Sequence, residues 1–324
     1  MKQRGQLPKQ HQRNRVSVVV SAYNEEGNVE VLWKSLSLQL DQLKNIETYE
    51  VLFVDDGSKD KTFAKLLNLQ KSESRIKIIK LSRNFGHEIA MTAGMDYASG
   101  DSVVLMDADL QHPPDVVPQL IEQWQQGSDI VLTRRMDAGG KSTLKRLIYN
   151  FAYWVLNKLQ EQDIPTQSPD FRLIDRYYID VLKNMDEKDR MLRGLLTWVA
   201  ADDCTFVDFS PAERLSGESK YSFRSLFKLG IDGILAFTDR PLKLALYLGA
   251  IALFFALALT GFTIWHHYAV DSTKTGYATI VVAVSLFSSI QLIILGIIGL
   301  YLGRIHMEVK SRPLYVAKLF GFDQ

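Results

Sequence analysis

Short apolar runs alternate with amphipathic stretches through the first part of the chain. Runs rich in valine, isoleucine and leucine predict buried strands at 15–21, 49–54, 76–81, 102–106 and 129–133. Helices are predicted after the first run to about residue 43, after the second to about 71, from about 86 to 100, and at 114–126. Strands that alternate with such helices are typical of βαβ units, so the sequence predicts an α/β fold with a mostly parallel sheet.

Two longer apolar segments lie in the last third of the chain. Twenty-two uncharged residues separate Lys243 from His266, and 29 separate Lys274 from Arg304. A helix rises about 1.5 Å per residue, so even the shorter segment reaches roughly 33 Å, enough for a bilayer core of about 30 Å. We therefore expect two C-terminal transmembrane helices.

Basic residues flank these segments unevenly. They lie before the first segment and after the second, whereas the connector has one lysine balanced by Asp271. The positive-inside rule then places both termini and the large domain in the cytoplasm, in a multi-pass protein of the inner (plasma) membrane.

The patterns predict five parts of the chain. They are a basic N-terminal tail (1–14), an α/β domain (15–215), a juxtamembrane amphipathic segment (216–240), the two transmembrane helices (241–303) and a cytoplasmic tail (304–324). The basic tail at 1–14 is expected either to contact anionic lipid or to be a solvated leader. Amphipathic stretches at 141–159 and 221–237 suit the membrane interface, with ordinary core helices as the alternative.

Composition removes several classes of function. The 324 residues carry 38 basic and 37 acidic side chains, a net charge of +1, so nucleic acid is not an expected partner. The single cysteine, Cys204, lies in a further predicted strand at 204–209. One cysteine excludes an intramolecular disulfide and a cysteine-built zinc site. A homo-oligomer is left open.

Polar signatures follow three of the predicted strands, namely Tyr23-Asn24-Glu25, Asp55-Asp56-Gly57-Ser58 and Asp107-Ala108-Asp109. Parallel strands bring these ends to one sheet edge, where α/β proteins bind ligands. Alternate side chains of an extended segment share a face, so Asp107, Asp109 and Gln111 suit a hard cation such as Mg²⁺ or Mn²⁺. A lone acidic triplet would merely end a strand and cap a helix. Neither G-x-x-x-x-G-K-[ST] nor G-x-G-x-x-G after the first strand is present, which argues against a P-loop and a dinucleotide site.

The second half supplies cations suited to phosphate. Arginine's planar fork matches phosphate oxygens. The candidate cations are Arg134, Arg135, Arg172, Arg193 and Lys220, and Ser219 and the acid Asp170 lie in the same motifs.

Five motifs resemble one known family. SAYNEEGNV, VDDGSKDKT, RNFGHEIAMTAGMDYA, DADLQHPP and PDFRLIDR occur in the order seen in family 2 glycosyltransferases of the GT-A fold. Within that family the chain is most similar to polyprenyl-phosphate glycosyltransferases related to dolichyl-phosphate mannose synthase, and among these to bacterial members that act on undecaprenyl phosphate. The resemblance covers roughly residues 15–320.

The resemblance implies a role for each candidate. Asp55 and Asp56 would bind base and ribose, and the remaining donor-site residues would be Ala22, Tyr23, Asn24, Glu25, Asp107 and Arg135. Asp107, Asp109 and Gln111 would hold the metal. The acceptor phosphate would contact Arg134, Arg172, Arg193, Ser219 and Lys220, and the catalytic residues would be Asp170, Asp109 and Arg172. Pro169 departs from the small residue expected there.

The implied activity is a metal-dependent, inverting transfer of a hexose, led by glucose from UDP-glucose, to undecaprenyl phosphate for cell-envelope glycans. Other donors remain open: a UDP-linked aminosugar, UDP-galactose or GDP-mannose. A membrane protein that binds nucleotide sugars without turnover is the alternative from another class. A processive synthase of the same fold would need a Q-x-x-R-W motif, which this chain lacks, and more spans.

Overall fold

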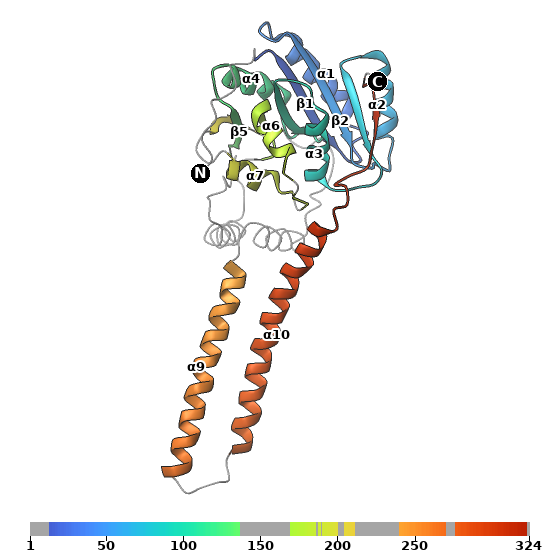
Figure 1. Cartoon of the computed structure of the whole chain (residues 1–324). Coiled ribbons are helices and arrows are strands. Elements are labelled where there is room, and N and C mark those ends of the chain that lie inside the picture. The colour runs from blue at the N-terminus through green and yellow to red at the C-terminus, as the bar shows by residue number, and fades with distance from the viewer. Residues whose placement is uncertain are drawn as a thin grey trace. The chain divides into compact units, whose positions relative to one another are not determined.

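The computed structural model describes residues 13–136, 169–185, 187–188, 190–199, 204–210, 240–269 and 276–322. The chain divides into two compact units. Unit 1 comprises Met1–Tyr153, Gln162–Tyr221 and Pro313–Gln324, and unit 2 comprises Trp154–Glu161 and Ser222–Arg312. Figure 1 shows the chain and labels many of its helices and strands.

Unit 1 is built on an eight-stranded sheet whose order is β7-β5-β6-β4-β1-β2-β3-β8. The strands are β1 (Arg15–Ala22), β2 (Thr48–Asp55), β3 (Ile76–Leu81), β4 (Ser102–Asp107), β5 (Ile130–Arg135), β6 (Arg172–Asp175), β7 (Cys204–Phe209) and β8 (Ala317–Phe320). β1 pairs in parallel with β2 and β4, as do β2 with β3 and β5 with β7, whereas β6 and β8 run antiparallel to their neighbours. The predicted α/β fold with a mostly parallel sheet is confirmed.

Helices cover both faces of this sheet. They are α1 (Val29–Asp41), α2 (Thr62–Ser72), α3 (His87–Tyr97), the short 3₁₀ turn η1 (Pro114–Val116), α4 (Val117–Gln125), α6 (Arg176–Lys183) and α7 (Leu192–Val199). Val16, Val18 and Val20 of β1 belong to the core cluster that buries apolar residues of α1, α2 and α4. Alternate residues of a strand point to opposite faces, so Val19 faces the other layer, where it meets α3.

The contact between α3 and β1 is unusually close. A Cβ added to Gly94 would lie 2.1 Å from Cγ1 of Val19, so only glycine fits there. This close packing fixes α3 against the middle of the sheet. It also holds His87, the first residue of α3, beside the carboxyl end of β1.

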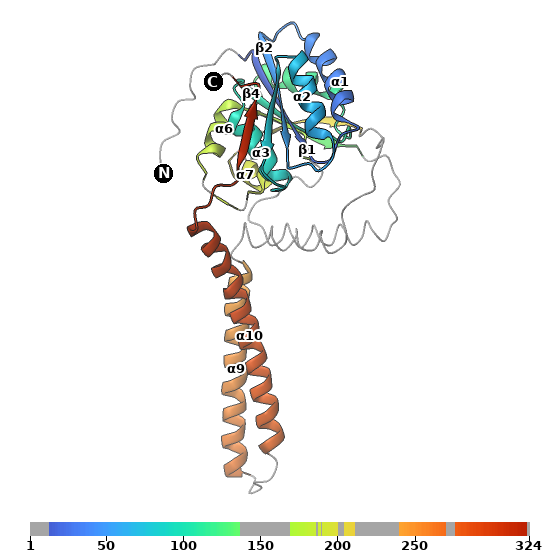
Figure 2. The ribbon, with the colours of Figure 1, turned by 90° about the vertical axis from the view of Figure 1, so that its right-hand side faces the viewer.

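The C-terminal segment of the chain closes one edge of the sheet. β8 pairs antiparallel with β3, with Ala317 opposite Leu81 and Phe320 opposite Ile78, and Figure 2 shows this strand in red. The Tyr315 hydroxyl donates a 2.7 Å hydrogen bond to Asp96 of α3. Part of the segment predicted as a tail is therefore an edge strand, which protects β3 from pairing with another chain.

Unit 2 contains two long helices, α9 (Arg240–Ala269) and α10 (Gly276–Val309). The predicted apolar segments both fall in these helices. Among the described residues, one stretch is long and apolar enough to cross a membrane, Leu286–Val309, with a mean hydropathy of 2.0. Tyr247–Phe262 of α9 is a shorter apolar stretch. The structure thus supports one of the two expected spans.

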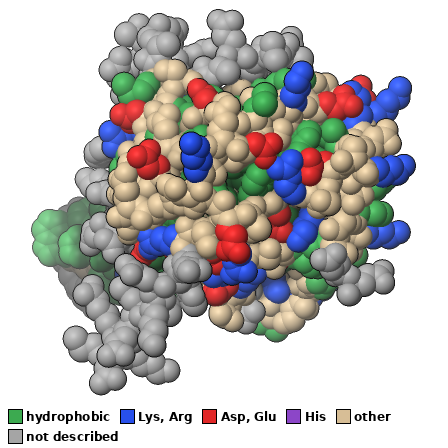
Figure 3. All heavy atoms as spheres, turned by 90° about the horizontal axis from the view of Figure 1, so that it is seen from above, with side chains coloured by type: hydrophobic (Ala, Val, Ile, Leu, Met, Phe, Trp, Pro, Cys, Tyr) green, Lys and Arg blue, Asp and Glu red, His purple; other side chains and the backbone are tan. Residues whose placement is uncertain are grey.

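Several predictions lie outside the described residues. They concern residues 1–12, the two amphipathic stretches, Ser219 and Lys220. Arg13, from the predicted tail, contacts Asp129 at 2.5 Å. Acidic and basic side chains are interspersed on the described face of unit 1 drawn in Figure 3.

Candidate active site

The carboxyl end of β4 carries Asp107, the first of the predicted metal ligands. Asp107 pairs with Ser21 of β1 in the parallel register, and the Ser21 hydroxyl donates to Asp107 Oδ1 at 2.9 Å. The Asp107 backbone N–H donates to Nδ1 of His112 at 3.0 Å. The His112 ring in turn stacks on Phe171, with centroids 5.0 Å apart. The carboxylate is therefore fixed in position.

Asp109 and Gln111 lie in the turn that follows β4. Asp109 Oδ1 accepts the backbone N–H of Gln111 at 3.0 Å, and Leu110 between them has a φ of +63°. The amide nitrogen of Gln111 is buried without a hydrogen-bond partner among the described residues. No group of three or more His, Cys, Asp or Glu side chains in the described part of the chain forms a metal cluster. The ligand set Asp107, Asp109 and Gln111 stays a prediction.

The chemistry of that set nevertheless fits a hard cation. Two carboxylates and an amide oxygen at one strand end are the oxygen donors that Mg²⁺ and Mn²⁺ prefer. The unpartnered Gln111 nitrogen is a hydrogen-bond donor, so it points to a missing acceptor and not to the cation itself. A ligand at this edge would supply one.

The two acids at the end of β2 have different surroundings. Asp56 is buried, and its two oxygens accept the backbone N–H groups of Phe85 at 2.7 Å and Gly86 at 3.0 Å. Burial raises the pKa of Asp56, and these two hydrogen bonds partly offset the rise. Asp55 Oδ1 accepts from the Ser58 N–H at 3.0 Å, whereas its buried Oδ2 has no partner among the described residues. Asp55 therefore has an unsatisfied acceptor in a fully buried side chain, and Asp56 holds the loop before α3.

The loop after β1 is tied to the loop after β2. The Asn24 N–H donates to Ser58 Oγ at 3.0 Å, and Asn24 Oδ1 accepts from the Lys59 N–H at 2.8 Å. The Glu25 N–H donates to Thr62 Oγ1 at 2.8 Å. The Ala22 carbonyl accepts from the Asp56 N–H at 2.9 Å. These predicted donor-site residues, with Tyr23 between them, therefore shape the edge around Asp55.

Antiparallel pairing brings Asp170 to the same edge. Leu105 of β4 lies opposite Arg172 of β6. Continuing this register by two residues sets Asp107 opposite Asp170. The two carboxylates are 63 positions apart in the sequence, but Asp107 is the last residue of β4 and Asp170 lies just before the first residue of β6.

Arg172, predicted to bind an acceptor phosphate, is buried, with 1% of its side chain exposed. It pairs with Asp170 and donates to the Pro169 carbonyl at 3.1 Å. Burial of Arg172 lowers its pKa. Burial alone would raise the pKa of Asp170, but Arg172, His87 and Arg193 outweigh it and hold that pKa well below its usual range. Arg172 therefore acts on Asp170, and its buried Nε has no hydrogen-bond partner among the described residues, so its contact with an acceptor phosphate stays a prediction.

The other predicted cations differ in position. Arg193 lies 3.6 Å from Asp170, and its buried Nε has no hydrogen-bond partner. Arg134 is stacked on the Phe206 ring at 4.7 Å and lies 3.9 Å from Asp208, with 45% of its side chain exposed. Arg135 is the exposed last residue of β5. The described site thus brings Arg193 into the Asp170 cluster and leaves Arg134 and Arg135 on the surface.

His87 is a site residue to which the sequence prediction gave no role. Its Nδ1 lies 3.0 Å from Ser21 Oγ and 3.2 Å from Asp107 Oδ1, and its Nε2 lies 3.4 Å from Asp170 Oδ2. Burial would lower the pKa of His87, but the two carboxylates outweigh it and raise the pKa to about 10. The available signal was its place directly after Gly86, at the start of the helix that follows β3.

Neighbouring Glu88 is part of the same cluster. Its carboxylate accepts the Leu192 N–H at 3.2 Å. Burial and the nearby Asp170 raise the pKa of Glu88. The edge therefore combines carboxylates whose pKa values are displaced in opposite directions, which is common at functional sites.

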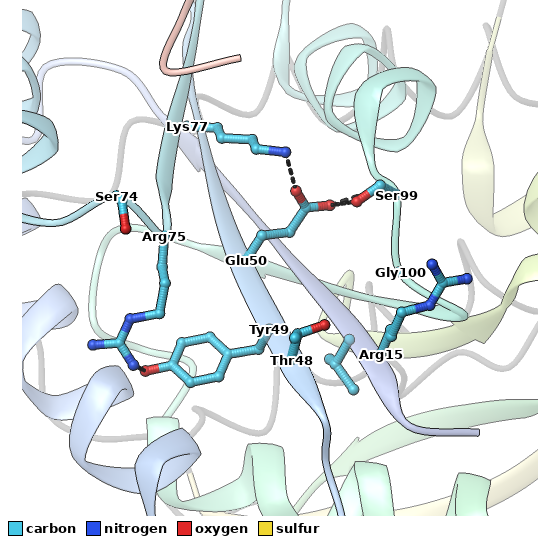
Figure 4. A pocket seen from close by; sticks show the side chains of 10 residues that line it. Arg15, Thr48, Tyr49, Glu50, Ser74, Arg75, Lys77, Ser99 and Gly100 are labelled. Atoms are coloured by element: carbon cyan, nitrogen blue, oxygen red, sulfur yellow. Dashed lines mark hydrogen bonds and ion pairs between the residues drawn. The ribbon is translucent and has the colours of Figure 1, made fainter. Parts of the chain in front are cut away.

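A cavity lies at the opposite, amino end of the strands. It measures 290 Å³, and the residues that line it include Arg15 and Thr48, which begin β1 and β2. Figure 4 shows its Glu50 held by Lys77 and Ser99. Its bases Arg15, Arg75 and Lys77 are all paired with carboxylates. Because its charges are mutually satisfied, this cavity is not the candidate active site.

The family model of glycosyl transferase family 2 matches residues 17–182, which contain every element of this edge from β1 to α6. The chain therefore belongs to glycosyl transferase family 2, as its motifs indicated, and the observed α/β sheet is that expected of the GT-A fold.

Relatives match over nearly the full chain. It is 42% identical to the uncharacterized glycosyltransferase YkcC of Bacillus subtilis, over 95% of this chain and 94% of that protein. It is 35% identical to an SfII prophage-derived bactoprenol glucosyl transferase of Shigella flexneri, over 94% and 97%. Among solved structures, glucosyl-3-phosphoglycerate synthase of Mycobacterium tuberculosis with Mn²⁺, UDP-glucose and phosphoglyceric acid is 19% identical, with a TM-score of 0.48 over 68% of this chain and 78% of that one.

Proposed function

We propose that this protein is a membrane-anchored glycosyltransferase that moves a hexose, glucose from UDP-glucose, onto a polyprenyl phosphate such as undecaprenyl phosphate. The observation that carries the proposal is the meeting of Asp107 with Asp170 at one sheet edge, with His87 between them. Relatives named bactoprenol glucosyl transferases, bactoprenol being a polyprenol, support the acceptor and the sugar.

The donor half-site is the edge formed by β1, β2 and β4. The free oxygen of Asp55 is an acceptor for a base N–H or a ribose hydroxyl. Asp107, Asp109 and Gln111 would hold Mg²⁺ or Mn²⁺, which would neutralise charge developing on the leaving diphosphate.

The acceptor half-site lies around Asp170. A phosphate monoester has a second pKa of about 6, so much of it is already dianionic at neutral pH and needs no strong general base. Arg193, whose Nε has no partner among the described residues, would bind the acceptor phosphate, and we propose that Arg134 assists it. Asp170 orients the acceptor or takes a residual proton. In-line attack by the phosphate oxygen would invert the sugar's anomeric carbon and release the nucleoside diphosphate.

The membrane arrangement is part of the proposal. α10 supplies one span by its length and hydropathy, and we propose α9 as the second, with unit 1 and both termini in the cytoplasm. A cysteine substituted for Ser272, in a Cys204→Ser background, would test this. This cysteine should react with a membrane-impermeant maleimide added outside spheroplasts. If it reacts only after lysis, the proposed orientation is wrong.

The activity is tested by mixing purified protein, undecaprenyl phosphate and Mn²⁺ with UDP-glucose, UDP-galactose, a UDP-aminosugar or GDP-mannose. Mass spectrometry of the lipid should show a hexose adduct with UDP-glucose, and a chelator should abolish it. If an adduct forms only with one of the other donors, that donor's sugar is the one transferred. Donor binding by calorimetry with no lipid product from any donor would favour the binding protein without turnover.

A further inference from the structure

His87 joins the two halves of the site. It is contributed by α3, whereas Asp107 ends β4 and Asp170 precedes β6. Its ring nitrogens face opposite ways, Nδ1 toward Ser21 and Asp107 and Nε2 toward Asp170. One side chain therefore contacts the donor-side and the acceptor-side carboxylate at the same time.

Each ring nitrogen has its own oxygen partner. Ser21 directs its hydroxyl proton toward Asp107 Oδ1 at 2.9 Å, and its oxygen lies 3.0 Å from Nδ1 of His87. Nε2 lies 3.4 Å from Oδ2 of Asp170. The imidazole ring therefore lies between the two carboxylates and contacts both.

The register explains why such a group is needed. Asp107 and Asp170 are directly opposite when the β4–β6 pairing is continued, and like charges directly opposite on neighbouring strands repel. Arg172 and Arg193 contact Asp170, but neither of these described arginines forms an ion pair with Asp107. His87 is the described side chain that contacts both carboxylates.

We propose that His87 is a positioning residue that holds the Asp170 carboxylate at a fixed distance from Asp107, so that the acceptor is presented to the bound donor in line. The proposal rests on the function proposed above. It predicts that His87 affects the turnover of bound substrates more than their binding, because it touches the carboxylates and acts through them.

The test is a set of His87 variants compared with Lys71→Gln, which removes one positive charge from an exposed position of α2. His87→Ala should lower kcat about 10–100-fold, the range for losing a charge-assisted hydrogen bond, with the KM for each substrate changed less than about threefold. His87→Gln, whose amide nitrogen can replace Nε2, should recover more turnover than His87→Asn, which reaches only the Asp107 side. Lys71→Gln should match the wild-type protein. A His87→Ala variant with normal kcat, or with a loss confined to KM, would overturn the proposal.

A double-mutant cycle separates this proposal from the proposed function. If His87 acts through Asp170, His87→Asn, which loses the Asp170 contact, should lower the melting temperature when made in the wild-type protein but change it by less than about 1 °C in an Asp170→Asn background. Equal shifts in both backgrounds would overturn the positioning role. This measurement needs no turnover, so it decides the role of His87 even if the wild-type protein transfers sugar from no donor, which would refute only the proposed function.

Discussion

The two adjacent acids at the end of β2 should respond in opposite ways to the same isosteric change. Asp56 accepts two backbone hydrogen bonds, whereas Asp55 has one oxygen engaged by Ser58 and one free. Asparagine retains one accepting oxygen and replaces the other with an N–H₂ donor. At Asp55 that donor can take the free position, but at Asp56 it must face a backbone N–H.

The expected magnitudes follow from these contacts. Asp56→Asn loses one charge-assisted hydrogen bond, about 1.5–3 kcal/mol of unfolding free energy. For a domain of this size that corresponds to a fall in melting temperature of roughly 3–12 °C. Asp55→Asn should leave the melting temperature within about 2 °C. It should weaken UDP binding about 10–100-fold, because a donor would then face the donor groups of base or ribose.

Melting temperature is measured by differential scanning fluorimetry and UDP affinity by isothermal titration calorimetry with Mn²⁺, on both variants in one detergent. The wild-type protein is the reference for both measurements. Unchanged UDP affinity in Asp55→Asn would refute the assignment of its free oxygen to the donor. An unchanged melting temperature in Asp56→Asn would refute its role in holding the loop before α3.

Three further predictions concern regions away from the donor. Burial opposes ionisation of Glu50, but its hydrogen bonds, led by that from Lys77, outweigh burial and lower the pKa of Glu50. The ionised carboxylate therefore stabilises the folded protein above pH 4.5, and this stabilisation is lost as pH falls through the lower pKa of the folded state. Glu50→Gln should therefore flatten the loss of stability in acid titrations followed by circular dichroism, and an unchanged acid slope would contradict this. Tyr315→Phe removes the hydrogen bond to Asp96 and should lower the unfolding free energy by about 1 kcal/mol in urea titrations, whereas no change would show that this bond is not stabilising. Deleting residues 313–324 should expose the β3 edge and cause aggregation on size-exclusion chromatography, and a monodisperse truncated protein would contradict the role of β8.

The parallel core of the sheet was predictable because its signals are local. The valine-rich β1 and the run that forms β4 are continuous apolar segments, and Asp55 and Asp107 follow such runs directly. Parallel pairing then brings their ends to one edge without knowledge of any further contact. The position of Asp55 and Asp107 at one sheet edge could therefore be predicted from the sequence.

The antiparallel strands and the contacts they create were not predictable in this way. β6 and β8 have only four residues each, and their pairing depends on partners about 70 and 240 positions away. The position of Asp170 opposite Asp107 depends on the register of β6. The burial of Arg172 and the bridging contacts of His87 depend in turn on that position. These are tertiary relations that no local pattern specifies.

The central claim is most directly tested by the transfer of label from UDP-[¹⁴C]glucose to undecaprenyl phosphate in the presence of Mn²⁺. Wild-type protein should move label into the organic phase. Asp109→Ala should lose this activity but keep its melting temperature, because Asp109 is partly exposed and is a proposed ligand of the metal. Equal lipid labelling by the two proteins would contradict the metal-dependent transfer on which the account depends.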